Sequence, residues 1–225
     1  RSSNATFSVR AGGVRLEAAA CDFGFAASLA QDPSSAGGGL VKLGSGRVTL
    51  SGNSTYTGPT IVSNGMLRVT GTLAVTNLTV APGAGLSLAD GALSVFAPAS
   101  LRIGTISNAS TLEAEVAASG SACDTLAVPA GAWVQRVSVS LVQQGTRVPL
   151  ARTGDFPIIT YAGTAIPAAN LSWGSPVKGF TCTFETDTAT RTIYARMRID
   201  GSSPEAVWIN PGSGAWSTAA NWSVL

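Results

Sequence analysis

The sequence predicts an all-β protein whose main part is a right-handed parallel β-helix, a solenoid of stacked coils, followed by a less regular β-rich part. Three observations predict this fold. Short apolar triplets recur along the chain, they return about every 20 residues, and only 12% of the residues are charged. A surface built from Ser, Thr, Asn and Gly suits short strands and tight turns better than helices.

Each triplet has the form apolar–any–apolar. Alternation with a period of two is typical of a strand with one buried face, so the outer residues should be buried and the middle residue should point outward. The residues expected to point outward are Thr49, Arg68, Thr79, Ser87, Ser94 and Arg102. The residues expected to be buried are Leu50, Val62, Leu67, Val69, Leu73, Val75, Leu78, Val80, Leu86, Leu88, Leu93, Val95, Leu101 and Ile103.

The spacing of the triplets indicates the length of a coil. Equivalent triplets begin at positions 48 and 67, at 73 and 93, and at 78 and 101. Three short strands therefore fit into each stretch of roughly 20 residues, which is the period range of solenoid repeats. Because each coil stacks on the one before it, we expect parallel pairing between coils over residues 1–120.

After about Glu115 the predicted strands become longer and more aromatic. They are Val137–Val142, Phe156–Tyr161, Phe180–Phe184 and Thr192–Arg198. Residues 121–206 are therefore interpreted as a continuation of the β stack or as a small appended β domain. Residues 207–225 are interpreted as the start of a following repeat unit.

The residue inventory argues against several classes of function. The net charge is +2 and the arginines are scattered, so no nucleic acid is expected as a partner. No stretch reaches the ~20 apolar residues of a membrane-spanning helix, so membrane insertion by this segment is not expected. Histidine is absent and the three cysteines, Cys21, Cys123 and Cys182, are far apart, so no metal or cofactor is predicted. Cys182 alternates with Phe180 and Phe184 and is expected in the core, whereas an intermolecular disulfide stays open for Cys21 and Cys123.

Residues 42–69 combine glycines and apolar residues at fixed spacing. From Leu43 the string LGSGRVTLSGNSTYTGPTIVSNGMLRV closely resembles the autotransporter-associated β-strand repeat, also called the passenger-associated transport repeat. The one departure is an additional residue between Asn53 and Tyr56, where the pattern has a single residue. The matching positions are Lys42, Gly44, Gly46, Leu50, Gly52, Asn53, Tyr56, Gly58, Thr60, Val62, Gly65, Leu67 and Val69. The resemblance implies a β-helical stalk of a bacterial secreted passenger, with no activity attached to the repeat itself.

Two weaker resemblances flank this repeat. The stretch from Asp124 to Tyr194 resembles the passenger region that follows such repeats, and the segment from Trp208 to Ser223 is similar to the Trp-rich opening of units in very large repeat-bearing surface proteins. With Arg1 in place of an initiator Met, we expect a processed piece or segment of a longer protein. Trp208, Trp216 and Trp222 could form a sugar-stacking platform, but we expect them to pack on a neighbouring unit or a copy of the chain, since three exposed indoles would make a large apolar patch.

Glu113 and Glu115 are the one candidate pair of catalytic carboxylates. They are two residues apart on a predicted strand and so share a face, and β-helix glycosidases and lyases use carboxylate pairs. Neither a histidine nor another acidic cluster completes a site. We therefore predict no catalytic, cofactor-binding or metal-binding residue, and no enzyme.

The sequence favours a structural or adhesive segment of a bacterial secreted or cell-surface passenger protein, located outside the cell or at the outer membrane. A β-helix lyase or hydrolase acting on polysaccharide is one alternative, and a self-assembling extracellular filament subunit is another. The expected partners are neighbouring repeat units, copies of the chain, and host or matrix glycans.

Overall fold

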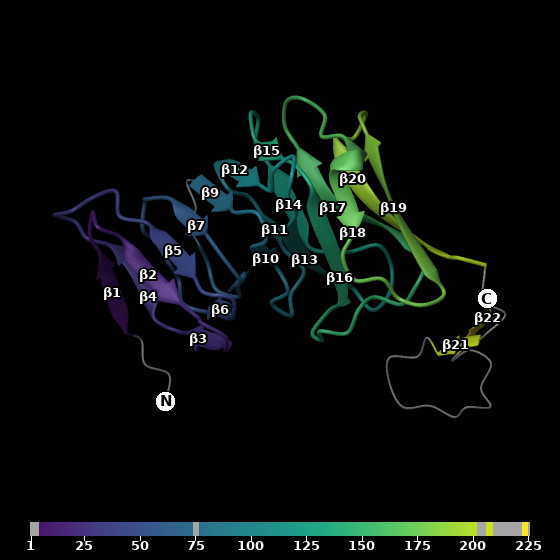
Figure 1. The fold of residues 1–225 in the computed structure, drawn as a ribbon, viewed down its shortest axis with the longest axis horizontal. Coiled ribbons are helices and arrows are strands. Elements are labelled where there is room, and N and C mark those ends of the chain that lie inside the picture. Colours follow the sequence, from purple (N-terminus) through teal and green to yellow (C-terminus); the bar gives the residue numbers. More distant parts are fainter. Residues whose placement is uncertain (1–4, 74–76, 202–205, 209–221, 225) are drawn as a thin grey trace.

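The computed structural model describes residues 5–73, 77–201, 206–208 and 222–224. Among these residues the one helix is a short 3-10 turn, η1 (Ala168–Asn170), and all other regular elements are strands. Strands that are far apart in sequence lie side by side along one elongated stack (Figure 1).

Two parallel sheets run along the stack. Sheet I has the order β2 (Val14–Glu17), β5 (Leu40–Leu43), β7 (Thr60–Val62), β9 (Asn77–Val80), β12 (Ser100–Ile103) and β15 (Trp133–Val134). Sheet II has the order β3 (Phe23–Phe25), β6 (Arg47–Leu50), β8 (Met66–Val69), β10 (Gly85–Ser87), β13 (Ser110–Val116), β16 (Val137–Gln143) and β18 (Leu171–Trp173). Each coil therefore contributes one strand to each sheet.

The third side of the stack is less regular. It begins as the parallel pair β1 (Thr6–Val9) and β4 (Ser28–Gln31) and continues through a parallel bridge between Ser54 and Leu73. Sheet III then has the order β11 (Val95–Phe96), β14 (Thr125–Val128), β17 (Gly154–Tyr161), β20 (Thr192–Ile199) and β19 (Phe180–Asp187). β17, β20 and β19 pair antiparallel, so the chain leaves the solenoid pattern at its C-terminal end.

The register between coils confirms the predicted parallel β-helix. Val48 on β6 lies opposite Leu67 on β8, which in turn lies opposite Leu86 on β10, so two successive coils have the same length here. Leu78 on β9 lies opposite Leu101 on β12, the longer step that the triplets predict. In the described part of the chain, the strand pairs of sheets I, II and III are parallel, except for the antiparallel pairs β17–β20 and β20–β19.

The core consists of columns of stacked apolar side chains. In sheet II one column runs through Val48, Leu67, Leu86, Leu112 and Val139, and each of these residues is fully buried. Burying one such aliphatic side chain contributes about 1.5–3 kcal/mol. A single coil buries little on its own, so stability accumulates as coils are added.

Most of the predicted inward residues are buried, but the prediction is wrong around residue 95. Val95 is 67% exposed, whereas Phe96 lies opposite the buried Leu126 and packs against the core. Leu73 and Leu93 are only half-buried, and Val75 lies outside the described residues. The alternation shifts by one residue here because the backbone N–H groups of Gly91 and Ser94 bind buried carboxylates, so residues 91–94 follow these hydrogen bonds and not a strand.

Ser87 faces outward, as predicted, yet it is fully buried. It lies between Arg68 on β8 and Glu113 on β13, and its hydroxyl donates to Glu113 Oε1 at 2.6 Å. The other predicted outward residues are exposed or half-buried. Polar side chains of neighbouring coils therefore cover part of the outer face of sheet II.

The longer strands predicted near the C-terminus are confirmed as β16, β17, β19 and β20. Sheets I and II continue across residue 120 through β15, β16 and β18, while the division into separate domains stays a prediction. β21 (Ala206–Trp208) and β22 (Trp222–Val224) pair antiparallel, with Trp208 opposite Trp222. The side chains of these tryptophans, and Trp216 altogether, lie outside the described residues.

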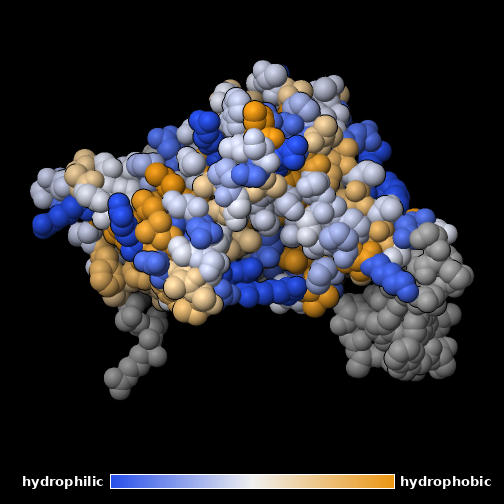
Figure 2. All heavy atoms as spheres, viewed as in Figure 1, coloured by the Kyte–Doolittle hydropathy of each residue, from blue (hydrophilic) through white to orange (hydrophobic). Residues whose placement is uncertain are grey.

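The surface is mixed in character. On the face drawn in Figure 2, hydrophilic and hydrophobic residues are interspersed. Cys182 is half-buried against the core, as expected, and the three cysteines are free, with Cys21 exposed. In the described part of the chain, no helix is long and apolar enough to cross a membrane.

Candidate functional site

Lys42 occupies an inward position of the repeat, and the residues at the equivalent position of the following coils are aliphatic. It lies opposite Val62 on β7, and its side chain is fully buried. The ammonium donates to the carbonyl oxygens of Gly44, Gly46 and Asn64 at 2.5, 2.5 and 2.8 Å. Burial lowers the pKa of Lys42, and the charge of Asp22 opposes that shift. Since an ammonium has three N–H donors, this corner satisfies all of them with main-chain acceptors of two successive coils.

Tyr56 and Thr60 form a second internal polar contact of the repeat. Thr60 stacks between Leu40 and Leu78 in an inward column, and it is fully buried. Its hydroxyl lies 2.5 Å from the Tyr56 hydroxyl, and burial raises the pKa of Tyr56 to about 12. The tyrosine ring fills the corner while its polar end is satisfied, as a buried tyrosine requires.

Gly65 explains why the repeat needs glycine at its corner. Its φ is +64°, and a Cβ at this position would clash with the Gly46 oxygen and lie 2.5 Å from Lys42 Nζ. Only a residue without a side chain lets the next coil approach the lysine-capped corner this closely.

Glu113 is held by an ion pair that spans four strands of sheet II. Its carboxylate accepts from both terminal nitrogens of Arg47 on β6, at 3.2 and 3.4 Å, in addition to the Ser87 hydroxyl. Both side chains are largely buried, with 15% of Arg47 and 12% of Glu113 exposed. Bidentate guanidinium–carboxylate pairs are among the strongest hydrogen-bonded contacts in proteins. This clamp joins β6 to β13 across β8 and β10.

Glu115 is fully buried, and its two oxygens bind two different loops. One oxygen accepts from the Gly91 N–H at 2.7 Å and the other from the Gly145 N–H at 3.1 Å. These loops follow β10 and β16, on the coils before and after that of Glu115, where the stack begins to widen. The carboxylate therefore replaces the strand partner that those N–H groups would otherwise have.

Asp124 completes this buried cluster. It accepts from the Ser94 N–H at 2.9 Å and from the Glu115 N–H at 2.8 Å, and it is fully buried. Burial raises the pKa of Asp124 to about 6; the two hydrogen bonds oppose the rise, and the charges of Glu115 and Asp90 add to it. The local sequence around Cys123, Asp124 and Thr125 gives no pattern that signals this burial.

The structure places Glu113 and Glu115 on one strand, as predicted, but each is engaged by donors of the protein. Sequence reasoning missed the Arg47–Glu113 clamp, the role of Asp124 and the inward position of Lys42. Only Lys42 had a signal, because the period of two places it on the same face as Leu40. In the part of the chain that the structure describes, no group of three His, Cys, Asp or Glu residues is arranged to hold a metal ion.

Residues 40–69 match the family model of the passenger-associated-transport-repeat. The chain thus contains this repeat, within two residues of the predicted bounds, and its Lys42, Tyr56, Thr60 and Gly65 are the residues that close the corners described above. Neither the curated proteins nor the solved structures contain a match to the chain. The repeat indicates a segment of an autotransporter passenger, and the family implies a secreted or cell-surface location.

The corner around Lys42 generates a prediction about two glycines. Gly65 and Gly83 both have positive φ, but a Cβ at Gly83 would meet no atom within 4 Å. Gly83→Ala should lower the free energy of unfolding by about 1–2 kcal/mol, the cost of the backbone conformation alone. Gly65→Ala adds a steric clash and should cost roughly 3 kcal/mol or more. Guanidinium unfolding followed by circular dichroism measures both, and equal losses in the two variants would contradict the role of the close approach.

Asp124 generates a prediction about pH. Its pKa is about 6 in the folded protein and near 3.8 in the unfolded chain, so the folded protein binds more protons between these values. The free energy of unfolding should therefore fall as the pH rises from about 4 to about 6, by at most about 3 kcal/mol, and then stay level.

Asp124→Asn removes the titrating group and should flatten this slope. Asp187→Asn is the contrasting control, because hydrogen bonds from Thr190 lower the pKa of Asp187, so its stabilisation is present above about pH 4 and lost below. Denaturant unfolding at pH steps from 3 to 8 measures the slopes. An unchanged slope between pH 4 and 6 in Asp124→Asn would mean that another group carries it.

Proposed function

We propose that this chain is a structural or adhesive segment of a passenger protein displayed outside the bacterial cell, with no catalysis of its own. The observation that carries the proposal is the continuous parallel stack, in which coil after coil is joined through main-chain hydrogen bonds and stacked apolar columns. Such a stack is stiff along its axis because each coil is fixed to its neighbours on three sides. Its role is to hold a binding region away from the cell surface.

The engagement of the acidic side chains supports the non-enzymatic proposal. A general acid or base must reach the substrate proton directly or through one water. Glu113 binds Arg47 and Ser87, and Glu115 binds two backbone N–H groups from a fully buried position. Through these hydrogen bonds the two glutamates hold coils and loops together, which is a structural role.

The alternative of a polysaccharide-active β-helix enzyme is tested on the same two residues. We expect no turnover of neutral or acidic polysaccharides by the wild-type chain, measured as release of reducing ends or of unsaturated products. Glu115→Gln should instead lower the free energy of unfolding by about 1–3 kcal/mol, since one buried N–H loses its acceptor. Wild-type turnover that disappears in Glu113→Gln or Glu115→Gln would overturn the proposal.

We also propose neighbouring repeat units or copies of the chain as partners. Among the described strands, β1, β2 and β3 are edge strands at one end of the stack, and each has one side without a strand partner. The end coil carries apolar residues that other coils bury: Phe7 is 52% exposed and lies 5.6 Å from the Phe25 ring. Open edges with apolar side chains favour addition of a further strand.

Sedimentation velocity over a concentration series tests this contact. The wild-type chain should associate, and Phe7→Asp should weaken association at least about tenfold because a charge at the edge opposes pairing. Ile106→Asp is the matched control, since Ile106 is 70% exposed and lies between β12 and β13, outside the end coil. A wild-type chain that stays monomeric at high concentration would remove copies of the chain as partners.

A further inference from the structure

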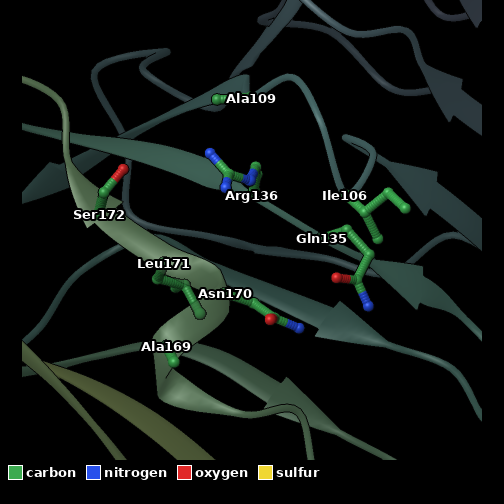
Figure 3. Close-up of a pocket in the computed structure, with 8 residues that line it drawn as sticks. All are labelled: Ile106, Ala109, Gln135, Arg136, Ala169, Asn170, Leu171 and Ser172. Atoms are coloured by element: carbon green, nitrogen blue, oxygen red, sulfur yellow. The ribbon is translucent and has the colours of Figure 1, made fainter.

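Three successive corners between sheet I and sheet II differ in length. The corner after β12 comprises residues 104–109, the corner after β15 comprises only Gln135 and Arg136, and the next approach to sheet II is the 3-10 turn η1 before β18. Because the short corner lies between two longer ones, it is recessed. The result is a notch of about 430 Å³ with Gln135 and Arg136 in it and the longer segments on either side (Figure 3).

Both sides of the notch are fixed by hydrogen bonds. In the first side, Thr105 N–H donates to Asn108 O at 3.0 Å, and Asn108 N–H donates to Thr105 Oγ1 at 3.2 Å. In the second side, Asn170 Nδ2 donates to Val134 O at 2.8 Å. Since these contacts set the shape in advance, a ligand would enter a preformed site.

The polar groups in the notch have free hydrogen-bonding capacity. In the described part of the chain, the Arg136 guanidinium, the Gln135 amide and the Ser172 hydroxyl have no hydrogen-bond or ion-pair partner. In Figure 3 the Arg136 and Ser172 side chains point toward one another across the notch, and the Gln135 and Asn170 amides lie below them. No acidic residue lines the notch, so its charge is positive.

Arg136 also has a strained backbone. Its φ is +42°, and Arg191 is the one other described residue besides glycine with a positive φ. Such conformations are costly for residues with a Cβ, and they concentrate at functional sites. Glycine would adopt this φ without strain, yet the position carries an arginine whose guanidinium lies in the notch.

We propose that this notch binds an acidic saccharide, a sugar ring that carries a carboxylate. A guanidinium recognises a carboxylate through two parallel hydrogen bonds, and the amides of Gln135 and Asn170 suit the ring hydroxyls. Ile106, which is 70% exposed, offers apolar contact for a ring face. The volume lies within the range of small-molecule sites.

Trp133 extends the site for a longer saccharide. It lies on β15, two positions before Gln135. Its ring is 44% exposed, and the Arg102 guanidinium lies 5.5 Å from the ring centroid. The Trp133 ring can stack on a further sugar ring, and Arg102 can pair with its carboxylate. This inference goes beyond the proposed stalk role, which would stand even if the notch bound nothing.

Calorimetric titration of the full chain tests the inference. The probes are D-glucuronate and a galacturonate disaccharide, with D-glucose and D-galactose as neutral counterparts and sodium acetate as a free carboxylate. We expect saturable binding of the acidic sugars that weakens with added salt. The neutral sugars and acetate should bind at least about tenfold more weakly.

Variants identify the residue. Arg136→Gln should weaken binding of the acidic sugars at least about tenfold. Arg191→Gln should leave it unchanged, as a matched control with the same backbone conformation at an exposed turn. Arg136→Gly should abolish binding with an equal or higher Tm, since glycine relieves the positive φ, which separates lost recognition from lost folding. Equal binding of neutral and acidic sugars, wild-type binding by Arg136→Gln, or no saturable binding up to about 10 mM would each overturn the inference.

Discussion

Parallel main-chain pairing between successive coils is the interaction on which the rest of the structure depends. Paired strands lie about 4.8 Å apart, so residues at equivalent positions of neighbouring coils are in contact. An apolar residue thereby extends a column, as Val48, Leu67 and Leu86 do. A polar residue at an inward position must find its partner within its own coil or the next. Lys42 and Thr60 meet this requirement, because their partners are the corner carbonyls and Tyr56.

The coils lengthen along the stack, and the buried acids lie where this happens. In sheet I the successive partners are Val41, Ile61, Thr79, Arg102 and Trp133. The step between coils thus grows from roughly 20 residues to roughly 30 within the range of solenoid repeats. The extra residues cannot all join the ladders of the two sheets, so their N–H groups need other acceptors. Glu115 and Asp124 supply acceptors to loops of two coils, the loop between β10 and β11 and the loop after β16. Burying these charges is costly, which is why the pKa of Asp124 is raised to about 6.

The strands, their parallel pairing and the repeat could be predicted from the sequence, because alternation and spacing are local signals that the main-chain ladder preserves. The predicted inward residues failed at residues 93–96, where side chains bind the backbone. The sequence also contains no sign that the outward residue Ser87 is covered by polar side chains of neighbouring coils. The Arg47–Glu113 clamp joins residues 66 positions apart, and nothing near either residue signals the contact. The notch could not be predicted from the sequence either, because its shape depends on the relative lengths of three corners from three coils.

The regular and irregular parts of the stack therefore differ in what they leave available. In the repeat, the buried ammonium and the paired hydroxyls of Tyr56 and Thr60 are satisfied internally, and the close approach at Gly65 leaves no space for a ligand. In the wider part, corners of unequal length leave a recess, and a guanidinium, an amide and a hydroxyl in it have no protein partner among the described residues. Unequal coils cost regularity, but in this chain they leave a concave polar site. A spacer with uniform coils would not need the strained backbone of Arg136. The positive φ of this residue does not help the coils to stack, but it places the guanidinium in the proposed binding site.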